Sequence, residues 1–403
     1  MSSFIGRIDT HSIERFTVVP TVNDTEDEGF LMPGQFIDIS LPGDETLTAI
    51  IEGVTGDSYR NQLQREAYQY SCRVSGELPR GMTLLSKSVW EATDNSLAGI
   101  FTRQVTSPVT LGTLWGRESN ILYQIDAKEK FIQKHTCIFG SSGSGKTTLL
   151  AVLLEELLLG SKARIVILDP NSDFSDFNAP KPGVSSTSEQ VTLLSMPMKL
   201  IRKPKVRPDR FDQEMQRHLL EAAPEICSYE SEDSLNPLED NNNRLVQYNL
   251  GGILSFSSRA VVAEAVLKKV WDWAESNRGH DTFVVIDEAH NLAPAMTEEA
   301  SQKRTLAWVN RFSGEGRKYG LYLILVSQRP AKIHSNALDN CRNFMVLRLD
   351  NQDDLESLAR RTAQVSLELL KRATTFSRHE ALLYGDLAPC AIIRPNNRRM
   401  GGT

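Results

Sequence analysis

A glycine- and serine-rich loop at residues 140–147 constrains the fold of this 403-residue chain more than any other feature of its sequence. The loop reads GSSGSGKT and fits the pattern GxxxxGK[ST] in full. Glycines let consecutive backbone N–H groups turn inward around phosphate, the lysine reaches the β- and γ-phosphates, and the last hydroxyl binds Mg²⁺. A flexible Gly/Ser turn is the alternative. The apolar strand before the loop and the leucine-rich helix after it favour a phosphate-binding loop.

The loop therefore predicts a site for ATP and Mg²⁺. We expect Lys146 to act on the phosphates and Thr147 to bind the metal. The residues predicted to contact the nucleotide are Gly140, Ser141, Ser142, Gly143, Ser144, Gly145, Lys146, Thr147 and Thr148.

The segment FVVIDEAH, residues 283–290, supplies two carboxylates after an apolar strand. Asp287 at the strand end can hold the Mg²⁺ shell, and Glu288 can polarise the attacking water as the catalytic base. The alternative is an acidic strand end that faces solvent. For His290 we expect a solvated or capping role and no chemistry.

A third strand, LILVSQRP, ends in the polar pair Ser327 and Gln328. Open α/β sheets bind ligands at the carboxyl ends of their strands. Gln328 is therefore predicted to sense the γ-phosphate as a catalytic residue. The alternative is a simple turn before Pro330.

The pattern of apolar and polar residues along the chain predicts an α/β protein with three parts. Short segments with a period of two favour a small N-terminal β-barrel or sandwich over residues 1–110. Continuous apolar strands that alternate with helices favour a mostly parallel sheet in a RecA-like P-loop core over residues 111–184 and 244–403. Between the two core segments, residues 185–243 are predicted to be a helical insertion.

Charge and cysteine content limit the classes of function. The formal net charge is −6 and the pI is near 5.8, so any DNA contact must use a local basic surface. The segment IRKPKVRPDR is a candidate to line a pore, and a solvated basic loop is the alternative reading. Its basic residues are Arg202, Lys203, Lys205, Arg207 and Arg210.

The five cysteines lie far apart in the sequence, which argues against a zinc site and against a disulfide framework. The sequence contains no apolar stretch near the roughly 20 residues that a membrane span needs. We therefore expect a cytoplasmic protein without a membrane role.

Taken in order, these motifs resemble the HerA family, in the HerA/FtsK branch of RecA-like ATPases. The resemblance covers nearly the whole chain, and GEGRKYG followed by SQRP after DEAH is its most specific part. The segments that carry it are IGRID, GQFIDIS, VTLGTL, KHTCIFGSSGSGKTT, ILDPNSDF, VIDEAHNLAP, GEGRKYG, ILVSQRPAKI and LLYGDLAPC.

The resemblance implies a homohexameric ring with a partner-docking barrel, through which ATP hydrolysis drives double-stranded DNA. It also implies an arginine supplied by a neighbouring subunit, for which Arg317 is the first candidate and Lys134 the second. Pairing with Glu315 is the alternative role for Arg317. Two features depart from the family: Asn171 stands where relatives usually have His, and the insertion is short.

Two functions remain open at this stage. The first is a DNA translocase that works with a separate effector, either a NurA-like nuclease or a sirtuin-like NADase, because no nuclease motif is recognisable in the chain. The second is a nucleotide-dependent ring scaffold that activates an effector with little translocation. An ABC-type ATPase is disfavoured because no LSGGQ-like signature lies between the P-loop and VIDEAH.

Overall fold

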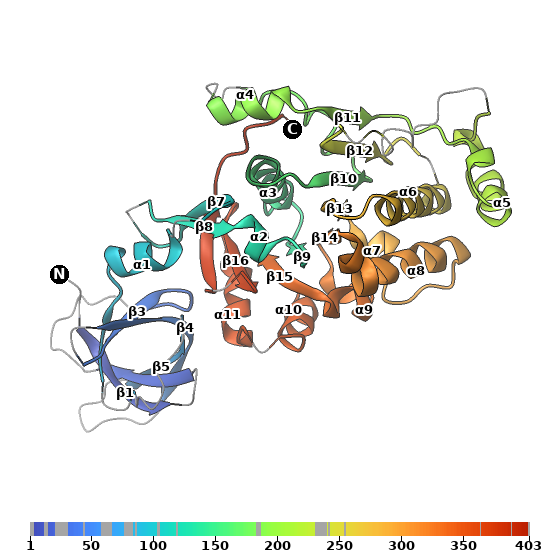
Figure 1. Cartoon of the computed structure of the whole chain (residues 1–403). Helices are drawn as coiled ribbons and strands as arrows, with labels where there is room; N and C mark the ends of the chain where they lie inside the picture. The colour runs from blue at the N-terminus through green and yellow to red at the C-terminus, as the bar shows by residue number, and fades with distance from the viewer. Residues whose placement is uncertain are drawn as a thin grey trace.

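The computed structural model shows a small N-terminal barrel beside a larger α/β domain (Figure 1). It describes residues 4–11, 15–20, 31–42, 45–57, 67–75, 84, 87–102, 105–117, 120–182, 187–229, 240, 242–253, 255–362, 364–387 and 389–401. Among the helices of these ranges, none combines the length and apolarity that a bilayer span requires.

Six antiparallel strands close the barrel in the order β1-β2-β5-β4-β3-β6. Their bounds are β1 Phe4–His11, β2 Arg15–Pro20, β3 Phe36–Ser40, β4 Thr46–Asp57, β5 Ala67–Val74 and β6 Ser88–Glu91. Ile37, Ile39 and Ile51 are among the apolar side chains of its core. The carboxylate of Glu52 is also buried, and it accepts hydrogen bonds from Arg15 at 2.9 Å and Arg73 at 2.7 Å. A buried charge needs such partners to be tolerated.

The barrel ends earlier than position 110. Helix α1 (Asp94–Phe101) follows β6, with the hydroxyl of Thr93 as its N-cap, and strand β7 (Pro108–Leu114) already belongs to the larger sheet. The sequence pattern predicts a linker around residues 106–130, but strand β8 (Leu122–Asp126) and helix α2 (Ala127–Lys130) lie in this stretch. The core therefore begins with an antiparallel hairpin before the P-loop strand.

The core is built on an 11-stranded sheet in the order β11-β12-β10-β13-β14-β9-β15-β16-β17-β7-β8. The strands from β11 to β15 are parallel, and the remaining strands pair antiparallel, so the prediction of a mostly parallel sheet is confirmed. The bounds of the strands not yet given are β9 His135–Phe139, β10 Arg164–Asp169, β11 Met198–Ile201, β12 Leu245–Asn249, β13 Thr282–Ile286, β14 Leu321–Ser327, β15 Cys341–Val346, β16 Ala381–Gly385 and β17 Ala391–Pro395.

Helices cover both faces of the parallel part. Crossover connections between parallel strands are right-handed. The crossover through α3 (Lys146–Gly160) runs along the sheet in one direction, and the crossovers through α6 (Phe256–Ser276) and α8 (Ala300–Glu315) run in the other. Helix α3 therefore lies on one face of the sheet, and α6 and α8 lie on the opposite face (Figure 1). Shorter helices complete the core: α7 Ala289–Leu292, η4 Gly316–Tyr319, η5 Pro330–Lys332, α9 Ser335–Asp339, α10 Gln352–Ala359, α11 Leu367–Lys371 and η6 Arg372–Thr375.

The segment 185–243, expected to be a helical insertion, also contributes the edge strand β11, which pairs parallel with β12. Four residues are too few to display a period, which is why the pattern did not reveal this strand. The helices of the segment are α4 Ser188–Ser195, η1 Pro208–Arg210, α5 Gln213–Ala222 and η2 Pro224–Ile226. Met215 and Leu219 of α5 are buried.

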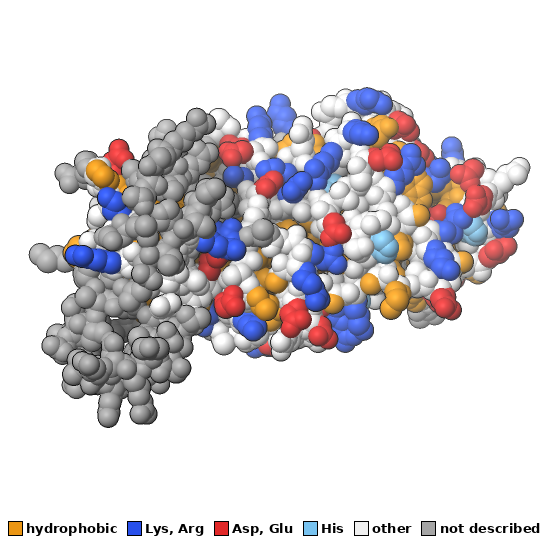
Figure 2. All heavy atoms as spheres, turned by 90° about the horizontal axis from the view of Figure 1, so that it is seen from below, with side chains coloured by type: hydrophobic (Ala, Val, Ile, Leu, Met, Phe, Trp, Pro, Cys, Tyr) orange, Lys and Arg blue, Asp and Glu red, His pale blue; other side chains and the backbone are white. Residues whose placement is uncertain are grey.

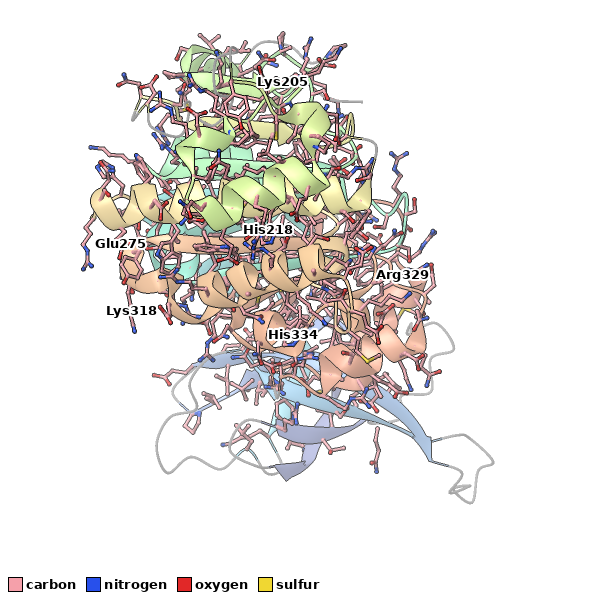
Figure 3. All side chains as sticks on the ribbon, turned by 90° about the vertical axis from the view of Figure 1, so that its right-hand side faces the viewer. Lys205, His218, Glu275, Lys318, Arg329 and His334 are labelled. Carbon is pink, nitrogen blue, oxygen red and sulfur yellow. The ribbon has the colours of Figure 1, made fainter. Side chains whose placement is uncertain are left out.

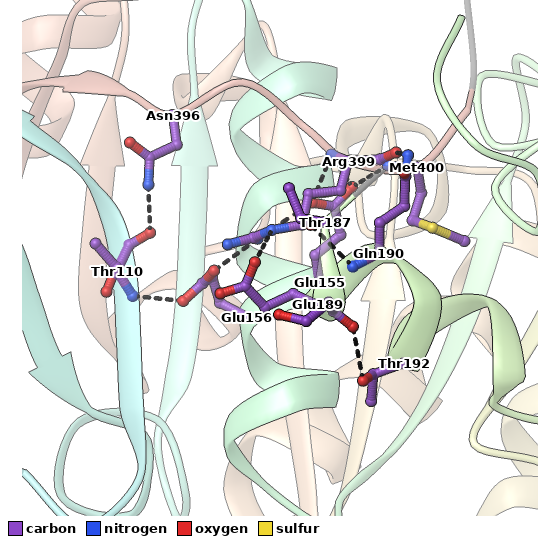
Figure 4. Close-up of polar contacts among 11 residues, drawn as sticks. Thr110, Glu155, Glu156, Thr187, Glu189, Gln190, Thr192, Asn396, Arg399 and Met400 are labelled. Atoms are coloured by element: carbon purple, nitrogen blue, oxygen red, sulfur yellow. Dashed lines mark hydrogen bonds and ion pairs between the residues drawn. The ribbon is translucent and has the colours of Figure 1, made fainter. Parts of the chain in front are cut away.

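A C-terminal strap, residues 396–401, crosses the P-loop helix α3 (Figure 4). The carboxylate of Glu155 has no exposed surface and accepts hydrogen bonds from the backbone N–H groups of Arg399 and Met400. The guanidinium of Arg399 lies 2.7 Å from the carboxylate of Glu156. The backbone carbonyl of Arg399 accepts a hydrogen bond from the side chain of Gln190 in α4. The strap thus satisfies two acidic residues on an otherwise apolar helix and joins that helix to α4.

Candidate nucleotide site

The P-loop connects β9 to α3 at the carboxyl edge of the parallel sheet. Gly143 and Gly145 have φ values of 74° and 106°, a region that favours glycine. A Cβ on Gly145 would also lie 2.6 Å from His379. Gly145 is the N-cap of α3 and offers no side-chain cap, so the first N–H groups of the helix can bind phosphate.

Lys146 reaches back over this loop, and its Nζ donates to the carbonyl of Ser141 at 3.1 Å. Burial lowers the pKa of the ammonium, while the carboxylates of Glu288, Asp287 and Asp173 oppose that change. The positive charge of Lys146 therefore sits between the loop and a group of acids. This is the arrangement that receives the β- and γ-phosphates of a nucleotide.

Asp287 follows the buried strand β13 and is itself 6% exposed. Burial, together with the charge of Glu288, raises its pKa to about 7. Its Oδ1 accepts the N–H of Glu288 at 2.9 Å. A carboxylate held this far from water gains most from a nearby cation, which fits the expected metal role.

Asp173 is a further site residue, to which the sequence pattern assigned no role. Its Oδ2 accepts the hydroxyl of Thr147 at 3.2 Å. Asp169, at the end of β10, positions it by accepting N–H groups of Asn171, Asp173 and Phe174. The segment ILDPNSDF contained the signal, because it places an acidic residue a few positions after an apolar strand. In the sequence analysis this segment served only to mark the family resemblance.

The Thr147 hydroxyl contacts a carboxylate oxygen of Asp173, and oxygen is the ligand type that Mg²⁺ prefers. In the described ranges no cluster of three or more His, Cys, Asp or Glu side chains forms a metal cage. Magnesium in ATPases is usually held by one or two carboxylates together with substrate phosphates and water, so no such cage is required. Thr147, Asp287 and Asp173 fit that pattern.

Glu288 is held in a left-handed backbone conformation with a φ of 47°. Such a conformation costs a residue other than glycine roughly 1–2 kcal/mol and is typical of functional positions. Burial raises the pKa of its carboxyl group; Lys146, the Gln328 N–H and the Asn171 side chain oppose the rise. Asn171, the position that departs from the family, therefore contacts the candidate base.

The expectation of a solvated or capping His290 is wrong. Its side chain is 16% exposed, and its Nδ1 lies 3.0 Å from the Ser327 hydroxyl and 3.2 Å from Oε2 of Glu288. The sequence pattern gave no signal for this contact, because Ser327 lies 37 positions after His290 in the chain. The tertiary packing of α7 against β14 instead turns the ring toward the carboxyl edge.

Gln328 follows Ser327 at the same edge, half-buried. A cavity of about 400 Å³ begins here and extends to the P-loop. Its polar lining includes Ser141, Gln328, Arg329, Lys332, Asp350 and Asp354. Gln328 and the first serine of the P-loop thus face one open space, and the γ-phosphate role of Gln328 stays a prediction.

Arg317 and Lys134 lie at the opposite edge of the sheet. Lys134 precedes β9 and pairs with Asp386 at 3.1 Å, and Arg317 precedes β14 and donates to the carbonyl of Asn340 at 2.7 Å. Within the described residues Arg317 makes no ion pair with Glu315. In Figure 3, Lys318 and Arg329, which adjoin Arg317 and Gln328, lie on opposite sides of the domain.

The length of β14 separates Arg317 from the P-loop of the same chain. The strand has seven residues and rises about 3.3 Å per residue, so it spans roughly 20 Å. An arginine side chain cannot bridge that distance. The structure therefore does not bring Arg317 or Lys134 together with Lys146, Glu288 and Gln328.

The basic segment 201–210 starts at the carboxyl end of the edge strand β11, and in Figure 3 Lys205 lies apart from Arg329, which adjoins Gln328. Several of its charges are already engaged: Arg202 with Asp176 at 3.4 Å, Lys205 with the carbonyl of Glu225, and Arg207 with Asp209. On the face drawn in Figure 2, basic and acidic side chains are interspersed over the core.

The fold and the site define the class: this is a RecA-like P-loop ATPase and an ATP hydrolase. The family model described as "Helicase HerA, central domain" matches residues 109–311, about half of the chain. The chain belongs to the HerA helicase family.

Individual relatives are distant. A probable helicase of Methanocaldococcus jannaschii is 22% identical over 78% of this chain and 70% of its own length. The DNA double-strand break repair helicase HerA of Sulfurisphaera tokodaii is 22% identical over 78% of this chain and 74% of its own. Among solved structures, the bacterial conjugative coupling protein TrwB matches with a TM-score of 0.51 and 13% identity, over 76% of this chain and 93% of that one, which shows a shared fold.

Proposed function

We propose that this chain is the motor subunit of a homohexameric ring that uses ATP hydrolysis to move double-stranded DNA. The observation that carries the proposal is the split of the catalytic set between two edges of one sheet. Lys146, Glu288 and Gln328 lie at the carboxyl edge, whereas Arg317 lies at the amino edge. A ring that places one edge against the other would complete each site.

The residues of the site support the following course of hydrolysis. The P-loop N–H groups and Lys146 bind and orient the phosphates, and Glu288 accepts a proton from the attacking water. Gln328 contacts the γ-phosphate, and Arg317 of a neighbouring subunit would meet the charge that develops there. Thr147 and Asp287, with Asp173, would hold a Mg²⁺ ion, which offsets phosphate charge when bound.

DNA enters the proposal through the family. Relatives bear the name DNA double-strand break repair helicase, and the sequence lacks a recognisable nuclease motif. We therefore propose that the ring works with a separate effector subunit, either a NurA-like nuclease or a sirtuin-like NADase, and that the barrel offers the docking surface. An effector of either kind suits repair or antiviral defence.

The decisive measurement is ATP turnover with and without duplex DNA, in the same buffer and at two salt concentrations. A translocase is expected to hydrolyse ATP several-fold faster on duplex DNA, and Glu288→Gln, as the control, is expected to bind DNA without turnover. Neutralising Arg202, Lys203 and Lys205 together should flatten the salt dependence of DNA binding if that segment contacts phosphates. An unchanged slope would leave it a solvated loop.

The second candidate is a nucleotide-dependent ring scaffold that activates an effector with little translocation. The net charge of −6 and the interspersed charges in Figure 2 favour it, because a DNA motor needs a local basic surface. Turnover that duplex DNA leaves unchanged, in a preparation that still forms rings with ATP, would replace the translocase proposal with this one.

A further inference from the structure

The side chains around Glu288 leave one of its two carboxylate oxygens without support. The Gln328 N–H and the Asn171 side chain contact the group. Oε2, however, is buried and makes no hydrogen bond within the described chain. Nδ1 of His290, a candidate donor, lies 3.2 Å from Oε2.

The distance between Nδ1 of His290 and Oε2 of Glu288 is within hydrogen-bond range. Because Oε2 nevertheless makes no hydrogen bond, the two groups are not aligned for one. Catalytic hydrogen bonds are often long or poorly aligned in a nucleotide-free protein and tighten when the substrate is bound. Glu288 also sits in a left-handed backbone conformation, which its surroundings must hold in place.

His290 is itself fixed by a neighbour. Ser327, the last residue of β14, lies 3.0 Å from Nδ1 through its hydroxyl, and the same hydroxyl accepts the backbone N–H of Arg329. The imidazole ring is therefore held at the end of β14, next to Gln328. Nδ1 faces two oxygen atoms, one of them a carboxylate oxygen.

We infer that His290 is a positioning residue for Glu288, with its Nδ1–H shared between the Ser327 hydroxyl and Oε2 of the carboxylate. An unprotonated Nδ1 would set its lone pair against a carboxylate oxygen, so the proton belongs on Nδ1. The ring aims Glu288 at the water and touches neither water nor phosphate.

The charge state of His290 suits this task. Burial, with Arg329 and Lys332 as further causes, lowers its pKa to about 4, so the imidazole is neutral near pH 7. A neutral donor holds the carboxylate in place, whereas an imidazolium would stabilise its anion and weaken it as a base. The Arg329 and Lys332 side chains, which line the adjoining cavity, thus keep the ring neutral.

This inference concerns ATP hydrolysis, and it goes beyond the proposed motor function without depending on DNA. The test therefore uses the full chain without DNA and compares three variants. The amide nitrogen of Asn reaches the position of Nδ1, whereas that of Gln reaches the position of Nε2. His290→Asn restores the inferred contact, and His290→Gln and His290→Ala do not.

We expect His290→Ala and His290→Gln to lose roughly 10- to 100-fold in kcat, as a misplaced catalytic group does, with KM for ATP nearly unchanged. His290→Asn should retain most of kcat. Ser327→Ala should show a smaller loss, and adding it to His290→Ala should cost little more, since both act through one contact.

His334→Ala is the matched control, because this histidine lies on the loop after β14 and caps the N–H of Asn336 instead. It should leave kcat unchanged. Equal losses for Asn and Gln, greater activity for Gln than for Asn, or a loss confined to KM would each overturn the inference. Thermal unfolding of every variant separates a folding defect from a turnover defect, and the Asn-to-Gln contrast stands even if His290→Ala does not fold.

Discussion

The two edges of the parallel sheet differ in how their charged residues are held. At the carboxyl edge Lys146, Asp287 and Glu288 are crowded together, and burial shifts the pKa of each. At the amino edge Lys134 and Arg317 are each bound to one partner, a carboxylate and a carbonyl. The first edge gathers the residues that would bind and hydrolyse a nucleotide, and the second holds two cations far from the P-loop of the same chain.

The largest effects are expected at the carboxyl edge. Lys146→Ala should abolish ATP binding, because the cation that meets the phosphates is lost. Glu288→Gln should retain binding and lose turnover by roughly 10²- to 10⁴-fold, because only the base is removed. Fluorescent-nucleotide binding and steady-state ATPase assays separate the two. Wild-type turnover in Glu288→Gln would contradict the role assigned to this carboxylate.

Removing the arginine of the amino edge should have the next largest effect. Arg317→Ala is expected to assemble and bind ATP but to hydrolyse it on the order of 10³-fold more slowly, as when an arginine supplied by a neighbour is removed. Mixing it with Lys146→Ala subunits should restore some activity, where an intact P-loop meets an intact Arg317.

Native mass measurement and confirmed subunit exchange are the controls for that mixture. Full activity of Arg317→Ala alone would remove the distinction between the two edges. If exchange occurs and no activity returns, the arginine acts inside its own subunit, and the distance along β14 must be reconsidered. Lys134→Ala, measured in parallel, tests the second candidate.

The smallest effect concerns the pH dependence of stability. His135 is fully buried beneath Arg317; its Nδ1 accepts the N–H of Leu323, so Nε2 carries the proton and donates to the carbonyl of Ser313. Burial, with the Arg317 charge, lowers its pKa from 6.5 to about 4. The contribution of the neutral ring is complete above pH 6.5 and falls by up to about 3 kcal/mol as the pH drops toward 4.

Urea unfolding between pH 7 and pH 4, followed by tryptophan fluorescence, measures this slope. His135→Gln keeps a donor for Ser313 and cannot be protonated in this range, so it should be less stable at pH 7 but show a flatter slope. Equal slopes in the two proteins would mean that the amino edge is not held by this neutral histidine.

Local patterns predicted much of this molecule. The P-loop was recognisable because its glycines, lysine and threonine are contiguous, and Asp287 and Glu288 because they end an apolar strand. The α/β class followed from alternating apolar strands and leucine-rich helices. In each case the residues that decide the structure are neighbours in sequence.

What the sequence did not reveal depends on contacts between distant segments. Asp173 contacts Thr147 only because Asp169 holds the loop after β10 in place. His290 contacts Ser327 only because α7 packs on β14. Strand β11 is too short to display a period. The hairpin of β7 and β8 looked like a linker because its antiparallel partner, β17, comes some 280 residues later in the chain.

The C-terminal strap has a practical consequence for anyone preparing this protein. Two main-chain N–H groups, those of Arg399 and Met400, solvate the buried carboxylate of Glu155, and no point substitution at either position deletes them unless it introduces proline. Shortening the chain by a handful of residues would therefore strand a charge against the helix that begins at Lys146.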